Sequence, residues 1–123
     1  MTTEPPPPSG AAALDEALHN PTRLAVAAFL YACDEAEFAA VRDHCQVSDS
    51  VLSKTASALE AVGYIEVRKG HVGKRPRTWL SLTGTGELAL EQHIAALQGI
   101  VAAAQDAGAS AQARPAAPRA PLS

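Results

Sequence analysis

The sequence predicts a mainly α-helical domain that carries one small β-hairpin, an α+β fold. Apolar residues recur with helical periodicity over residues 49–62, whereas apolar and polar residues alternate within 64–68 and again within 77–82. A basic segment that contains two glycines joins these alternating stretches. The chain of 123 residues is long enough for a single domain with one core.

Low-complexity segments flank this domain. Residues 1–10, MTTEPPPPSG, contain a proline run that fits neither a helix nor a sheet, so we expect a disordered leader. Residues 105–123 are rich in Ala and Pro and are expected to form a disordered tail. The folded domain should therefore span residues 11–104. With only five aromatic residues in the chain, its core must consist mainly of Leu, Val, Ile and Ala.

The domain is predicted to begin with two helices. A short helix over residues 11–19 is expected because it has two leucines one turn apart. Asn20 is a suitable N-cap for a second helix, with Pro21 at the first position, where a missing amide costs nothing. This second helix, which should reach about residue 33, is apolar on nearly every side. We expect it to be the central, buried helix.

An acidic segment separates the second helix from a third. Residues 34–37, Asp-Glu-Ala-Glu, are expected to interrupt the apolar run and to begin the third helix, where carboxylates favour the positive helix end. Phe38, Val41 and Cys45 follow with spacings i, i+3 and i+7. These three side chains should pack the third helix against the core.

Residues 48–62 are predicted to form an amphipathic helix, with Ser48 as N-cap and Gly63 as the residue that ends it. Its apolar arc contains Val51, Leu52, Thr55, Ala56, Leu59 and Val62. Its polar arc contains Asp49, Ser50, Ser53, Lys54, Ser57 and Glu60. Together with the third helix and a short turn at residues 46–47, it forms a helix-turn-helix whose polar face points outward.

Two short strands are predicted after this helix. Ile65 and Val67 alternate with polar residues, as do Thr78, Leu80 and Leu82 later in the chain. The segment between them, KGHVGKRP at residues 69–76, is then the tip of a hairpin, rich in cations and in turn-forming Gly and Pro.

A serine-rich helix face beside a basic hairpin favours double-stranded DNA as the partner. Hydroxyls reach base edges or phosphates, and cations neutralise the backbone. The net charge of −3 argues against nucleic acid, yet residues 46–83 hold six cations and only three anions. Taken alone, the basic tip is also consistent with a solvated turn. The neighbouring helix face favours DNA. Because the positive charge of residues 46–83 is modest, tight binding is expected only through two copies of the site.

The segment SDSVLSKTASALEAVGYIEVRKG, followed by KRPRTWLSLT, resembles the recognition helix and wing of winged helix-turn-helix transcriptional regulators of the MarR and ArsR types. The resemblance covers roughly residues 12–102, and the block LEAVGYI leading into RPRTWLSLT is its most specific part. Gln46 stands where such proteins often have a turn glycine, and Thr55 where histidine is frequent. A left-handed backbone is therefore expected at a non-glycine residue.

The resemblance implies a transcriptional regulator that binds specific DNA sequences, with recognition helix 48–62 in the major groove and wing 69–77 on the backbone or minor groove. On the helix, the expected contact residues are Ser48, Ser50, Ser53, Lys54 and Ser57. On the wing they are Lys69, Lys74, Arg75 and Arg77.

A long helix is predicted from Thr83 to about Ala104, with a heptad-like seam of apolar residues. The seam exceeds what one small domain can bury, so a homodimer is expected, with the helix over residues 11–19 packed beside it. The predicted interface residues are Leu14, Leu18, Leu90, Ile94, Leu97 and Val101.

Other chemistry is not indicated. A zinc site built from residues such as Cys33, His44, Cys45 and His93 lacks a closed four-ligand spacing, and Cys45 fits a core position without a redox role. The histidines are scattered, and no catalytic motif or phosphate-binding glycine loop occurs. We therefore expect no enzyme activity, no cofactor and no metal.

The compartment and the remaining partners follow from what the sequence lacks. It contains neither a signal peptide nor a long apolar segment, and two cysteines suit a reduced, cytoplasmic protein without a membrane partner. A small-molecule effector is not indicated. The alternative function is a winged-helix module that binds another protein and not DNA, since fold does not decide function.

Overall fold

The structure is a computed structural model, and it describes residues 14–112. The expected leader, residues 1–10, lies outside the described residues, as does the last part of the expected tail, residues 113–123. The elements in chain order are α1 (Pro21–Tyr31), β1 (Ala36–Glu37), α2 (Phe38–Cys45), α3 (Asp49–Ala61), β2 (Ile65–Val72), β3 (Arg75–Leu82) and α4 (Gly84–Gln112). They form a mainly α-helical domain with a small three-stranded antiparallel sheet, which is the winged helix fold expected from the sequence.

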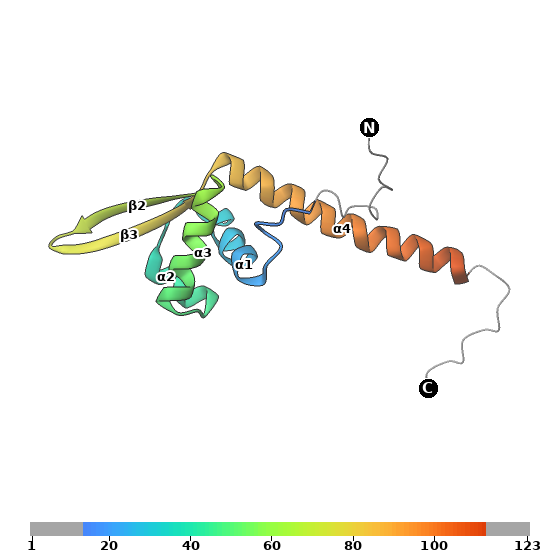
Figure 1. Cartoon of the computed structure of the whole chain (residues 1–123), viewed down its shortest axis with the longest axis horizontal. Coiled ribbons are helices and arrows are strands. Elements are labelled where there is room, and N and C mark those ends of the chain that lie inside the picture. Colours follow the sequence, from blue (N-terminus) through green and yellow to red (C-terminus); the bar gives the residue numbers. More distant parts are fainter. Residues whose placement is uncertain (1–13, 113–123) are drawn as a thin grey trace.

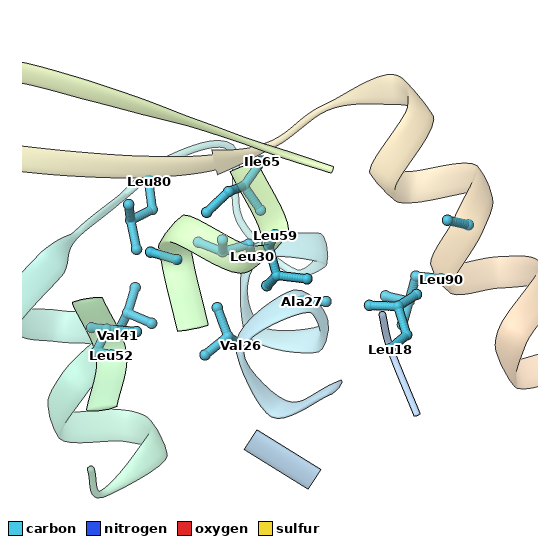
Figure 2. Packing of buried hydrophobic residues seen from close by; sticks show 12 residues of the cluster. Leu18, Val26, Ala27, Leu30, Val41, Leu52, Leu59, Ile65, Leu80 and Leu90 are labelled. Carbon is cyan, nitrogen blue, oxygen red and sulfur yellow. The ribbon is translucent and has the colours of Figure 1, made fainter. Parts of the chain in front are cut away.

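Helices α1, α2 and α3, the first part of α4 and the sheet enclose one core. Figure 1 shows α1, α2 and α3 grouped together, the β2–β3 hairpin extending from them in one direction, and α4 extending in the other. Leucine and other aliphatic side chains fill the space between these elements, as Figure 2 shows. The core contains Leu18, Val26, Ala27, Leu30, Val41, Leu52, Ala56, Leu59, Ile65, Leu80, Ala89 and Leu90.

The helix predicted for residues 11–19 is wrong in its described part, because residues 16–18 form a turn. The carboxylate of Asp15 accepts a hydrogen bond from the amide of Ala17, at 2.9 Å, and its carbonyl accepts one from the amide of Leu18, at 3.0 Å. Its own amide donates to Nδ1 of His93, at 3.0 Å. These contacts hold the backbone in a turn while still burying Leu18 in the core.

The acidic segment is not a helix start, contrary to the sequence-based expectation. Ala36–Glu37 forms β1, which pairs with β3 in the order β1-β3-β2, and α2 begins only at Phe38. Phe38, Val41 and Cys45 pack against or within the core as predicted. The sequence reasoning missed β1 because two residues carry no periodicity.

The hairpin strands extend further than the sequence indicated. Val72 pairs with Arg75, so the connection is only two residues long, in place of the expected eight-residue tip. Gly73 has φ +63° at the first of these two positions, which is where a type II′ turn requires positive φ. Pro76 lies inside β3 at the exposed end of the hairpin. The wing is therefore a long two-stranded ribbon with a tight end.

Helix α4 begins as predicted and runs further than predicted. The hydroxyl of Thr83 accepts a hydrogen bond from the amide of Gly86, at 2.9 Å, and so caps the helix. The helix continues to Gln112, so residues 105–112 are helical although they were expected in the tail. A Cβ on Gly86 would lie 2.1 Å from the carbonyl oxygen of Tyr64. Only glycine therefore allows α4 to pack this closely on the start of the wing.

Candidate nucleic-acid interface

Helix α3 presents its polar face outward, as predicted. Ser48 caps it, with Oγ 3.1 Å from the amide of Val51 and 3.2 Å from Oγ of Ser50. The Ser48 hydroxyl is therefore already used as a hydrogen-bond acceptor at the start of α3. The side chains of the other predicted contact residues, Ser50, Ser53, Lys54 and Ser57, are exposed.

The apolar arc of α3 is narrower than the sequence predicted. Leu52, Ala56 and Leu59 are buried, but Val51 and Val62 are 41% and 48% exposed. Only four of the 13 residues of α3 are buried, which leaves a broad outer face in which Ser50 and Ser57, two turns apart, lie near the middle. This face is wide enough for contacts on both of its flanks.

A cleft of about 690 Å³ separates α3 from the wing. Its lining residues are Phe38, Ser53, Ala56, Ser57, Glu60, Val67, Lys69, Thr78 and Leu80. Apolar side chains thus supply part of the lining, and three hydroxyl groups with one ammonium group supply hydrogen-bond donors. The exception is Glu60, whose carboxylate repels anions. The structure thus brings Ser53, Ser57 and Lys69 together from two elements.

Two arginines of the wing are already paired with carboxylates. Arg68 donates two hydrogen bonds to Glu35, at 3.0 and 2.7 Å, and its guanidinium carbon lies 4.2 Å from the centroid of the Trp79 ring. These hydrogen bonds lower the pKa of Glu35, so the carboxylate stays ionised at neutral pH. Arg77 lies 3.6 Å from Glu37. Sequence reasoning missed both acidic partners because it assigned them to a helix start.

The end of the wing, in contrast, carries free positive charge. Lys74 and Arg75 are exposed and form no ion pair with any carboxylate of residues 14–112. Lys69 faces the α3 cleft from the middle of β2. Of the four predicted wing contacts, Arg77 is therefore the one that forms an ion pair with a described carboxylate.

The turn before α3 has the left-handed residue that the sequence indicated. Gln46 has φ +56° and is the only non-glycine residue with positive φ in the described part of the chain. Arg42 on α2 bridges the two helices of the motif, with hydrogen bonds to Asp43 at 3.0 Å and to Asp49 at 2.9 Å. This exposed contact links α2 to α3 and pairs the carboxylate at the start of α3 with a cation.

The cysteines and histidines have structural surroundings. Burial raises the pKa of the Cys45 thiol, which keeps it protonated and unreactive. The thiol of Cys33 donates to the carbonyl of Phe29, at 3.1 Å, and His44 stacks on the Phe29 ring with centroids 4.3 Å apart. Within residues 14–112, no group of three or more His, Cys, Asp or Glu side chains is placed to hold a metal ion.

A buried polar cluster joins the N-terminal turn to α4. Tyr64 donates its hydroxyl proton to the carboxylate of Asp15, which raises the pKa of Tyr64 to about 12. The side chain of His93 is also in this cluster: it is 1% exposed, and its Nδ1 accepts a hydrogen bond from the backbone amide of Asp15. Burial lowers the pKa of His93, and the neighbouring His19 lowers it further.

Comparison with known proteins identifies the fold. A family model described as a winged helix DNA-binding domain matches residues 22–101. The chain belongs to this winged helix family. Its members are DNA-binding domains and not enzymes. No protein of curated function matches the sequence.

Solved structures place this winged helix domain beside transcriptional regulators of the MarR family. A transcriptional regulator homologue from Pyrococcus horikoshii OT3 has a TM-score of 0.67 and 24% identity, over 72% of this chain and 87% of that chain. The zinc-responsive MarR family member ZitR of Lactococcus lactis has a TM-score of 0.50 and 18% identity, over 74% of this chain and 61% of that chain. The structure of overoxidized AbfR bound to DNA has a TM-score of 0.57 and 16% identity, over 83% of this chain and 78% of that chain. At these identities the likeness shows the fold alone.

The predicted interface residues of this winged helix domain lie in two different surroundings. Leu18 and Leu90 both belong to the core of the single chain, and Figure 2 labels them among its side chains, so their surface is already covered. Ile94 and Val101 are 41% and 56% exposed. Leu14 and Leu97 are half-buried. The apolar surface open to a partner therefore lies on α4, beyond Leu90.

No described helix has the length and apolar character that crossing a membrane requires.

Proposed function

We propose that this protein is a transcriptional regulator that binds specific sequences of double-stranded DNA, with α3 in the major groove and the wing against the backbone or minor groove. The observation that carries the proposal is the exposed outer face of α3 beside a free cationic wing end. Serine side chains read base edges weakly, so affinity must come largely from the phosphates and from repetition of the site. The winged helix family and the regulator neighbours support DNA as the partner.

We also propose that it acts as a homodimer through α4. Ile94, Leu97 and Val101 follow one another at i, i+3 and i+7, and this apolar surface is only partly covered within one chain. A twofold partner would cover it and would place two recognition helices about 34 Å apart, one helical turn of DNA. The expected target is then a near-palindromic site.

Selection of bound fragments from random duplex DNA tests the DNA proposal. We expect enrichment of a short sequence with twofold symmetry, and binding that weakens steeply as salt rises. Replacing Ser50 and Ser57 by alanine should flatten the preference among sequences, because these hydroxyls lie near the middle of the outer face. Alanine at Ser48 should instead lower stability, since that hydroxyl caps α3.

The alternative is a winged helix module that binds another protein. It predicts no enrichment of any duplex, and binding to a protein partner that is insensitive to salt. Enrichment without any loss of preference in the Ser50 and Ser57 variant would count against α3 as the reader while leaving DNA binding intact.

A further inference from the structure

A second cleft lies on the flank of α3 that faces away from the wing. It has a volume of about 230 Å³ and joins the start of α1 to the first two turns of α3. The residues that line it are Asn20, Thr22, Arg23, Val51, Lys54 and Thr55. Neither the cap residue Asn20 nor the two α1 residues Thr22 and Arg23 were expected to contact DNA.

The cleft brings two cations together from helices that are distant in the sequence. Arg23 and Lys54 both line it, no carboxylate does, and neither side chain forms an ion pair with the carboxylates of residues 14–112. Two like charges at one cleft repel each other, so they favour an anion between them. The hydroxyl of Thr22 adds a hydrogen-bond donor on the same side.

The backbone at the start of α1 does not supply this anion affinity. Oδ1 of Asn20 accepts hydrogen bonds from the amides of Thr22 and Arg23, both at 3.0 Å, and Pro21 has no amide proton. The first-turn donors are therefore already used. The affinity of the cleft for an anion must therefore come from side chains of α1 and α3.

The position of the cleft on α3 identifies the anion. Lys54 lies on the α1 flank of the outer face, whereas Ser53 lines the cleft on the wing flank. A helix seated in the major groove has one DNA backbone on each side. The clefts on the two flanks therefore meet different strands, and the one lined by Arg23 and Lys54 has no carboxylate.

We propose that Arg23, Thr22 and Lys54 bind a backbone phosphate on the DNA strand opposite the one beside the wing. This inference rests on the proposed DNA binding of α3. It assigns Lys54 to the backbone and not to a base, and it adds Arg23 and Thr22 as positioning residues that fix the register of α3 in the groove.

Salt titration of binding to the selected duplex tests the site. Arg23→Ala combined with Lys54→Ala should weaken all duplexes alike and reduce the slope of log K against log salt by about 0.9, since the two cations share one phosphate and each phosphate contact contributes about 0.9. Arg23→Lys keeps the charge and should retain the slope. An unchanged slope in the alanine variant, with binding by the parent chain intact, overturns the inference. Absence of binding by the parent chain would instead overturn the proposed function.

A neutral phosphate analogue locates the contact. Methylphosphonate at single positions of the duplex should weaken the parent chain at one phosphate on the strand away from the wing, and the same substitution should cost the Arg23→Ala, Lys54→Ala double variant little further affinity. Additive losses at every phosphate overturn the assignment. So does a Lys54→Ala variant that loses its preference among sequences, because that result places Lys54 on a base. Circular dichroism before each titration confirms that the variants are folded.

Discussion

The carboxylate of Glu35 holds the guanidinium of Arg68 against the face of Trp79, and this contact ties the wing to the segment between α1 and β1. The wing is therefore attached to the helices at its base through an ion pair as well as through the sheet. The same contact removes one cation from those available to phosphates. The carboxylate of Glu37 likewise pairs with the guanidinium of Arg77, at 3.6 Å, and makes that cation less available to phosphates.

Removing Glu35 should increase affinity for DNA. In Glu35→Ala the guanidinium of Arg68 is released, and we expect tighter binding with a salt slope steeper by about 0.9 if it reaches a phosphate. Glu66→Ala is the matched control, because that residue on β2 is exposed and pairs with no cation of residues 14–112. Salt titrations that give both variants the same slope would show that Arg68 gains no phosphate contact.

The wing end should supply phosphate contacts that are independent of sequence. Lys74→Ala with Arg75→Ala should weaken selected and random duplexes by the same factor and lower the salt slope by about 1.8 for two lost contacts. Both side chains are exposed, so stability should not change. A selective loss on the preferred duplex would instead assign the wing end to base reading.

Glycine at position 86 should be required for the packing of α4. In Gly86→Ala the new methyl group meets the carbonyl oxygen of Tyr64, and we expect a loss of roughly 1–3 kcal/mol in the free energy of unfolding. Gly108→Ala on the same helix meets no atom within 4 Å and should change stability by no more than a gain of about 1 kcal/mol. Urea denaturation of the two variants measures the difference.

Stability should fall in mild acid because of His93. Its pKa is lowered in the folded state, so the unfolded chain binds more protons as the pH drops below the ordinary histidine value of 6.5. Protonation also removes the acceptor for the Asp15 amide. The stabilisation is thus complete above pH 6.5 and is lost as the pH falls toward the lowered pKa. Urea denaturation between pH 8 and pH 5 should show this decline.

A variant at position 93 separates this effect from other titrating groups. His93→Gln retains an acceptor without a titrating ring and should flatten the pH profile between pH 6.5 and pH 5. His71→Ala on the exposed wing should leave the profile as it is. A profile that is equally steep in His93→Gln would assign the acid sensitivity to another group.

The proposed dimer predicts different outcomes for neighbouring residues of α4. Ile94→Asp places a charge where a partner would bury it, at a cost of several kcal/mol to association, yet the exposure of Ile94 leaves the single chain folded. Sedimentation should show a dimer for the parent chain and a folded monomer for this variant. Leu90→Asp should unfold the chain, because Leu90 lies in the core. A monomeric parent chain that still binds DNA tightly would contradict the dimer and the palindromic site.

Local chemistry in the sequence was sufficient for much of the fold. Ser48 and Gly63 mark the two ends of the α3 region because a cap and a left-handed glycine act within a few residues. The left-handed backbone at Gln46, in contrast, was expected only from the resemblance to winged helix-turn-helix regulators, and it is present. The serine-rich face of α3 followed from helical periodicity alone. Whether these residues contact DNA stays a prediction, as do the cytoplasmic location and the dimer.

Only the tertiary structure decided how charges and apolar surfaces are shared between distant segments. Glu35 and Glu37 became partners of wing arginines because β1 pairs with β3, and such a two-residue strand exists only through its neighbour. Arg23 meets Lys54 because α1 packs beside α3, across thirty residues of chain. Leu90 belongs to the core and Ile94 to the surface because α4 packs on the domain through one side, where Gly86 lies close to Tyr64. Periodicity along one helix shows which side chains share a face, but the packed neighbours decide which face is covered.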